Sequence, residues 1–340
     1  MVAGISAPAY FLWLPTYNPL EEKSFLEKFS YIDWLGAILN AAVFVLFIVV
    51  LTFAGITWEW KDGRIITFWV VFGVLLLCHV LQQRYSILTN KERRIFPSRF
   101  LLHRSMPLIF ATSAASTSIL LVPTYYLPLY FQFVHGDSAI EAAVRLLPFI
   151  SFAITSVMVS GLILMKTGHY MACYLFSGAI TVCGGALMLV VTPNTAIASV
   201  YGFSILLGVG AGTTFQMGYT VAANQVKPEE VPDTISFINV AQLGGGSIAL
   251  SIADSIFQNV GLEKLSSALS RSGFSAADLH SALAGARSSL FTSATDAERE
   301  AAVEAIVSTM NLVFALCVAA GSLNIIMSLL MKREKLELKS

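Results

Sequence analysis

Eight apolar stretches recur along this chain, and they leave few folds open to it. A helix needs about 20 residues to cross the hydrocarbon core of a bilayer, where each unpaired backbone group costs several kcal/mol. Only 12% of the residues are charged, against about 25% in soluble domains. We therefore predict an all-α polytopic membrane protein with spans at roughly 34–55, 65–83, 107–133, 142–165, 170–191, 198–224, 234–257 and 306–331.

Basic residues are distributed unevenly among the connections between these spans. One set of alternate connections, with the two ends of the chain, carries 14 of the 21 Lys and Arg residues, six of them between Arg84 and Arg104. The short connections of the other set carry three: Lys61, Arg64 and Arg145. Cytoplasmic loops are richer in Lys and Arg, so we predict that both termini and the loop 84–106 lie in the cytoplasm. Residues 258–305 then lie outside.

The two spans between Tyr201 and Leu250 combine small residues with amides. Glycines cost about 1 kcal/mol each in a soluble helix, but in a bilayer they let helix backbones approach closely. We assign Gly208, Gly210, Gly212, Gly244, Gly245 and Gly246 to helix packing. The amides of Gln216, Asn239 and Gln242 allow two interpretations: they join helices by hydrogen bonds, or they line a polar substrate cavity.

A second polar group lies toward the outer end of the third span: Tyr125, Tyr126, Tyr130 and Gln132. The nearby Pro123 and Pro128 kink the predicted helix and free backbone carbonyls, which suits a cavity wall. Tyrosine also favours the membrane interface without any ligand, so both interpretations stay open.

Three ionisable residues occur within or beside spans. Arg145, near the outer end of the fourth span, is expected to extend its guanidinium to the surface or to pair with Asp137 or Glu141. Asp254 is expected at the outer boundary of the seventh span, with an acid relay as the alternative. His79 is expected to be a packed or interfacial histidine.

Other features exclude whole classes of function. The four cysteines show neither metal-ligand spacing nor a disulfide framework, and no phosphate-binding loop occurs. We expect no metal, no cofactor, no catalytic residue and no nucleic-acid partner. Phe96, Phe100 and Leu101 lie among the basic residues of the loop 84–106, and we expect them to rest on an anionic inner leaflet.

The long polar region 258–305 contains Leu265, Leu269, Leu279 and Leu283 among serines and alanines. This spacing, together with a helical pattern from Ala297 to Val307, indicates one or two short amphipathic helices over the outer mouth. A disordered loop is the alternative for so polar a segment.

Six pieces of the sequence, in order, resemble one family: YIDWLGAIL at 31–39, YYLPLYFQ at 125–132, AAVRLLPFI at 142–150, SGLILMKTGHY at 160–170, GVGAGTTFQ at 208–216 and NVAQLGGGSIAL at 239–250. They are similar to the C-terminal part of fungal major facilitator superfamily transporters, within it the drug:proton antiporters with fourteen spans. Gly161, Lys166 and Gly168 resemble a degenerate second copy of that family's glycine-basic loop motif. An ordinary turn with an inner lysine is the other interpretation.

The resemblance implies a domain layout. Residues 1–30 are the end of an upstream helix and a cytoplasmic linker, and residues 31–83 are two extra transmembrane helices. Residues 84–106 form a basic cytoplasmic loop. Residues 107–331 form a six-helix C-terminal transporter half with the outer loop 258–305, and residues 332–340 form a cytoplasmic tail.

The resemblance also implies a function: efflux of small, amphipathic organic compounds such as toxins, drugs or secondary metabolites, across the plasma membrane and with protons as the coupling ion. The six N-terminal helices of the family are absent from this sequence. We therefore expect the exposed amide face to be covered by a missing N-terminal half or by a second copy of the chain. The alternative function is a non-transporting remnant or an assembly component of the membrane.

Overall fold

The computed structural model describes residues 32–90, 94–270, 272–286 and 288–336, together with Pro8, Ser24, Glu27 and Phe29. The described residues form helices and no strand. Eight helical stretches in this part are long and apolar enough to span a membrane, which confirms the prediction of an all-α polytopic membrane protein. Most of the predicted upstream segment 1–30 and the end of the tail, 337–340, lie outside the described residues.

The spans are built from ten helices, two of the spans being broken in two. Their bounds are α3 (Trp34–Phe53), α4 (Gly63–Tyr85), α5 (Ser105–His135), α6 (Ala139–Arg145), α7 (Leu147–Thr167), α8 (Tyr170–Met188), α9 (Ile197–Phe215), α10 (Met217–Ala223), α11 (Val231–Ala268) and α14 (Asp296–Leu330). Four short helices connect them: η1 (Ser98–Leu102), η2 (Pro228–Glu230), α12 (Ala276–Ala284) and α13 (Ser289–Ser293).

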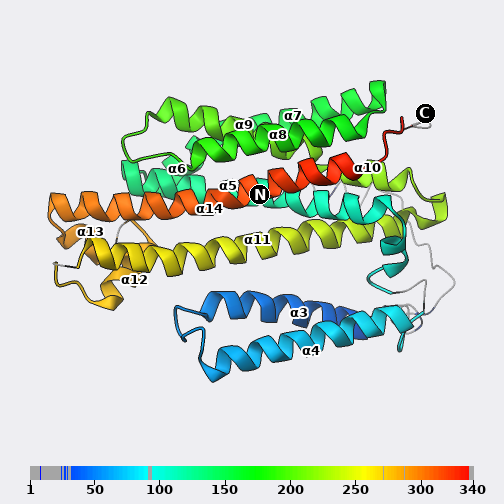
Figure 1. The fold of residues 1–340 in the computed structure, drawn as a ribbon, viewed down its shortest axis with the longest axis horizontal. Coiled ribbons are helices and arrows are strands. Elements are labelled where there is room, and N and C mark those ends of the chain that lie inside the picture. Colours follow the sequence, from blue (N-terminus) through cyan, green and yellow to red (C-terminus); the bar gives the residue numbers. More distant parts are fainter. Residues whose placement is uncertain are drawn as a thin grey trace.

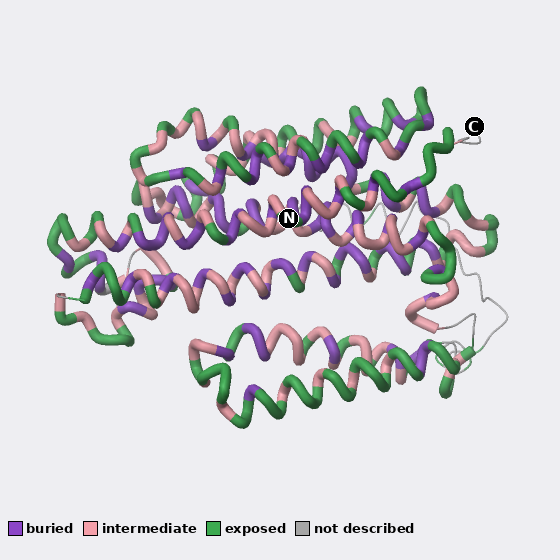
Figure 2. The backbone as a smooth tube through the Cα atoms, viewed as in Figure 1, coloured by how far each residue is buried: buried purple, intermediate pink, exposed green. Residues whose placement is uncertain are grey.

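The helices from α5 to α14 form one bundle, and the α3–α4 hairpin lies at its edge (Figure 1). Within the bundle α14 packs on α5, α8 and α11, while α7 packs almost entirely on α9. The hairpin reaches the bundle through α3, which contacts α11. Figure 2 shows buried residues concentrated along α5 and α14, and mostly exposed residues along α4. The exposed residues of α4 and α7 are largely apolar, as suits helices that face lipid.

The fourth and sixth spans are interrupted, although the sequence analysis treated each as one helix. The fourth breaks at Leu146 because Pro148, in the first turn of α7, cannot donate the backbone hydrogen bond of a continuous helix. The sixth breaks at Gln216, between α9 and α10. By contrast, α5 stays a single helix of 31 residues with Pro123 and Pro128 inside it.

Two spans continue far beyond the predicted ends. Helix α11 runs on to Ala268, and α14 begins at Asp296 with a capping box made by Thr295 and Glu298. Hydropathy marks where a helix leaves the bilayer, whereas capping marks where it ends, so the continuation of α11 was not predicted. The helical pattern of 297–307 was predicted, but as a short helix separate from the last span. Between the two extensions lie α12 and α13, in the region where short amphipathic helices were expected. Leu279 and Leu283 of α12 are buried.

A buried carboxylate fastens the α3–α4 hairpin to the segment that leads into α5. Asp33 is 2% exposed and accepts hydrogen bonds from the Gln82 and Gln83 amides, at 3.0 and 2.9 Å. It also accepts from the backbone N–H of Gly36 at 2.9 Å and of Ile95 at 3.3 Å. Four donors therefore converge on one side chain, which satisfies the oxygens of the carboxylate without water.

The basic loop packs on protein rather than on lipid. Phe100 is 1% exposed, and its ring centroid lies 5.6 Å from that of Phe237 on α11. Phe96 packs on the same ring at 5.4 Å, and Arg99 forms an ion pair of 2.5 Å with Asp233. The expectation that Phe100 rests on the inner leaflet was therefore wrong, and Phe96 is half-buried on the same ring. For Leu101, which is 46% exposed, it stays a prediction. Burying the two phenylalanines against Phe237 removes as much apolar surface from water as a lipid contact would.

Candidate substrate-facing surface

Two of the three predicted amides meet around a tyrosine. The Tyr219 hydroxyl on α10 lies 2.5 Å from Asn239 Oδ1 and 3.0 Å from Gln242 Oε1, both on α11, and donates its single proton to one or the other. The Gln242 Nε2 in turn donates to the Phe215 carbonyl at 2.6 Å. That carbonyl lies where the sixth span is interrupted, so Gln242 pairs a backbone group at the break. We call Tyr219, Asn239 and Gln242 the amide cluster.

The members of the cluster differ in exposure. Gln242 is 6% exposed, whereas Asn239 is exposed and Tyr219 is intermediate. Gln216 lies one turn before Tyr219; it is exposed, and none of the described residues hydrogen-bonds its side chain. The cluster therefore joins α10 to α11 through Gln242 and leaves Asn239 and Gln216 open on the surface. The contacts of Gln242 fit the helix-joining interpretation, and substrate-cavity lining by Gln216 and Asn239 stays a prediction.

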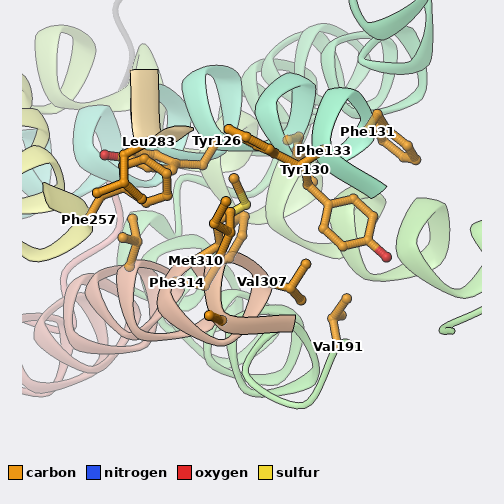
Figure 3. Packing of buried hydrophobic residues seen from close by; sticks show 14 of the residues in the cluster. Tyr126, Tyr130, Phe131, Phe133, Val191, Phe257, Leu283, Val307, Met310 and Phe314 are labelled. Atoms are coloured by element: carbon orange, nitrogen blue, oxygen red, sulfur yellow. The ribbon is translucent and has the colours of Figure 1, made fainter. Parts of the chain in front are cut away.

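The four polar residues of α5 do not share one environment. Tyr126 and Tyr130 are each 1% exposed and pack in the core of the bundle, Tyr126 close to Phe257 (Figure 3). The Tyr130 hydroxyl donates to the Thr192 carbonyl at 3.2 Å. Tyr125 is 58% exposed, because neighbouring residues point to different faces of a helix.

Gln132 lies elsewhere, in a cavity of about 650 Å³ at the end of the bundle where α14 begins. Thr192 and Asn194, from the turn after α8, line the same cavity. Arg299 and Glu300, from the extension of α14, complete its polar wall. Gln132 is therefore separated from the amide cluster, and the structure does not bring the two predicted polar groups together.

The glycines of α9 lie where helices approach one another closely. A Cβ atom added at Gly208 would lie 2.5 Å from the Phe149 carbonyl oxygen of α7, and one at Gly212 would collide with the Ala153 carbonyl. A Cβ at Gly210 would collide with Thr181 of α8. These glycines let α9 approach the backbones of both neighbours.

The three glycines of α11 contact three different partners. A Cβ at Gly244 would lie 2.7 Å from the Phe44 ring of α3. A Cβ at Gly245 would lie 2.5 Å from Ala114, and one at Gly246 would lie 2.6 Å from Leu121, both on α5. Helix α11 therefore packs on the α3–α4 hairpin and on α5 through one run of glycines.

The loop motif forms the turn between α7 and α8. Gly168 has φ +69° and ends α7 in the left-handed conformation that glycine adopts most readily. Its carbonyl accepts the Leu336 N–H at 2.9 Å, so the C-terminal tail folds back onto this turn. Lys166 is exposed, and no atom lies within 4 Å of a Cβ added at Gly161.

The isolated ionisable residues have near neighbours. Arg145 forms an ion pair with Asp137 and stacks over the Phe131 ring at 5.2 Å, as one of its two expected arrangements required. Asp254 is partly buried and hydrogen-bonds Gln258 one turn further along α11. The Nδ1 atom of His79 is buried and has no hydrogen-bond partner among the described residues.

Sequence reasoning missed Tyr219, the residue that organises the amide cluster. Its spacing was visible, three residues after Gln216 and on the same span. The tyrosine alone gave no reason to pair it with Asn239, because the pairing depends on how α10 lies against α11. Sequence reasoning also missed the polar contacts of Asp33, for the same reason.

Comparison with a family model and with curated proteins points to one and the same family of transporters. Residues 3–250 match the family model described as Major Facilitator Superfamily. The efflux pump patC of Aspergillus clavatus is 41% identical over 330 residues, which cover 96% of this chain and 60% of that protein. The MFS-type transporter patC of Penicillium expansum is 39% identical, covering 98% and 62%. The chain thus spans about three fifths of the length of these relatives.

Proposed function

Since the chain belongs to the major facilitator superfamily, we propose that it provides the C-terminal part of a transporter that exports small, amphipathic organic compounds. The relatives support the direction of transport, because several are named efflux pumps. Toxins, drugs and secondary metabolites are the substrate classes that we propose. One relative is named as the transporter of a phomenoic acid biosynthesis cluster.

The observation that carries the proposal is the neutral polar surface around the amide cluster. Gln216 and Asn239 present uncharged donors and acceptors on otherwise apolar helices. Such a surface hydrogen-bonds a neutral compound and leaves its apolar part in contact with apolar side chains. A charged substrate would require an opposite charge there, and the amide cluster has none.

The exposed amides require a cover, because hydrocarbon cannot hydrogen-bond them. We propose that helices equivalent to the remaining two fifths of the relatives' length cover this surface and enclose the substrate. A second copy of the chain, related by a two-fold axis, is the other cover. The mass of the particle in lipid discs distinguishes one copy of the chain from two.

We also propose that export is coupled to protons, and dissipation of the proton gradient should then stop export.

We expect Gln216→Leu and Asn239→Leu each to lower export about fivefold, since one hydrogen bond to the substrate contributes about 1 kcal/mol. Export is measured as the cellular accumulation of a fluorescent amphipathic dye, which rises when export falls. The gene is expressed from its own locus so that any flanking coding sequence is kept. Ser236→Ala is the matched control, because this exposed hydroxyl already bonds the Pro232 carbonyl of its own helix.

The membrane abundance of each variant must equal that of the wild-type protein, because less protein would also lower export. Normal export by both leucine variants would assign the amides to helix packing alone. No export by the wild-type gene would favour the non-transporting membrane component.

We further propose a plasma-membrane location, and, from the 14-to-three distribution of basic residues, that both termini are cytoplasmic. A reporter inserted after Arg94 is expected to be cytoplasmic. One inserted at Gly273, an exposed turn with open space around it, is expected to be external. The opposite result at either site would reverse the proposed orientation.

A further inference from the structure

A polar cavity of about 460 Å³ lies at the end of the bundle where the tail follows α14. Its walls come from the starts of α5 and α8, the end of α10 and the tail itself. Arg104, Lys332 and Lys335 line it, together with His103 and Glu334. Residues more than 200 positions apart in the sequence therefore meet around one space.

Two hydrogen bonds hold the tail against this cavity. The Tyr170 hydroxyl donates to the Lys332 carbonyl at 3.0 Å, and the Leu336 N–H donates to the Gly168 carbonyl at 2.9 Å. Leu336 also packs on the buried cluster that contains Tyr170. Lys332 and Lys335 are thereby kept at the cavity wall.

The cavity has an excess of positive charge. Among the described residues, three cationic side chains line it and one carboxylate, Glu334, which pairs with Lys332 at 3.2 Å. Neither Arg104 nor Lys335 forms an ion pair with another described residue. Helices α5 and α8 both begin here without an acidic residue in the first turn and without a side-chain cap. Their N-terminal N–H groups and dipoles add to the positive potential.

We propose that this cavity binds the phosphate headgroup of an anionic phospholipid. Phosphate oxygens accept hydrogen bonds from guanidinium, ammonium and free backbone N–H groups, and those are the donors present. The cavity opens among the ends of three spanning helices, at the level where headgroups lie. A lipid reaches that level with its acyl chains still in the bilayer, whereas a soluble phosphate must come from the aqueous phase.

The test is binding of dioctanoyl phosphatidic acid to the purified chain in detergent, measured by calorimetry. Dioctanoyl phosphatidylcholine and inorganic phosphate are the two comparison ligands. We expect phosphatidic acid to bind more than about tenfold more tightly than either comparison ligand, because the cavity favours an anionic headgroup that is anchored in the micelle. The readout needs no transport, so it is independent of the proposed function.

Substitutions assign the binding to the cavity. Arg104→Ala with Lys335→Ala is expected to weaken phosphatidic acid binding about twentyfold, from two lost cationic contacts. Arg333→Ala is the matched control, a cation of the same tail outside the cavity lining, with an expected change under about twofold. Glu334→Gln removes the acidic side chain that the described part of the lining contains, and it is expected to tighten binding, which an unfolded variant could not do.

Equal weakening by Arg333→Ala and by the double substitution would overturn the proposal in favour of diffuse surface charge. Unchanged binding in the double substitution would also overturn it. Inorganic phosphate binding as tightly as phosphatidic acid, with the same dependence on Arg104, would replace the lipid with a soluble phosphate ligand.

Discussion

Replacing Gly212 with valine is expected to lower the amount of folded protein in membranes at least about tenfold, from an overpacking cost of about 3 kcal/mol. A Cβ at this position would meet the Ala153 backbone of α7, at 2.8 Å from its carbonyl carbon and closer still to its carbonyl oxygen. No flexible side chain stands between them that could move aside. Because α7 packs almost entirely on α9, separating these helices detaches α7 from the bundle. Size-exclusion chromatography of a fluorescent fusion measures the folded amount.

The matched control is Gly202→Val, on the same helix. No atom lies within 4 Å of a Cβ at Gly202, so the substitution tests the loss of glycine without the collision. We expect its folded amount to stay within about twofold of the wild type, since valine is tolerated in an exposed helical position. Equal amounts of the two variants would show that α7 does not depend on close contact with α9.

Asp33→Ala is the second substitution with a large expected effect, a loss of about 3 to 5 kcal/mol in stability. It removes the acceptor of the Gln82 and Gln83 amides and of the Ile95 N–H, all in a buried site. Each orphaned donor costs about 1 to 3 kcal/mol, reduced where a donor finds another acceptor. We expect the α3–α4 hairpin to detach and trypsin to cleave the loop 84–106 faster in the purified protein.

Asp62→Ala provides the comparison for Asp33, because both aspartates cap a helix of the hairpin. Asp62 accepts the Arg64 N–H at 2.8 Å, but in an exposed turn where water replaces the lost acceptor. An N-cap substitution of this kind costs about 1 kcal/mol. Equal cleavage rates in the two variants would reduce Asp33 to an ordinary helix cap.

The spans and their order could be predicted from the sequence because the bilayer imposes a simple requirement on length and polarity. The end of α11 could not, since this helix continues where that requirement no longer applies. At the start of α14 the helical pattern of 297–307 was visible, but not that it continues into the span without a break. The break at Leu146 was predictable from Pro148, but the break at Gln216 has no such local signal. The length and polarity of each local stretch determine where the chain enters and leaves the membrane.

The candidate site was predictable only in part. The presence of Gln216, Asn239 and Gln242 pointed to polar contacts between two spans, and the structure shows Gln242 in such contacts. Which amide is buried and which is exposed depends on the rotation of each helix about its axis. Tyr126 and Tyr130, one turn apart, face the core, and Tyr125 faces outward. An apolar span in lipid gives almost no periodicity from which that rotation can be read.

The extensions of α11 and α14 continue these helices without a break beyond the predicted spans. Helix α11 has 38 residues, which at 1.5 Å each is about 57 Å, against a hydrocarbon thickness of about 30 Å. Lys264 in the extension of α11 donates from its Nζ to the Ser308 carbonyl of α14 at 3.1 Å. Because neither helix breaks at the membrane surface, a tilt of about 10° inside the bilayer displaces the outer tip by roughly 5 Å. Movements of the buried bundle are thereby amplified outside the membrane, where a label on α12 can detect them.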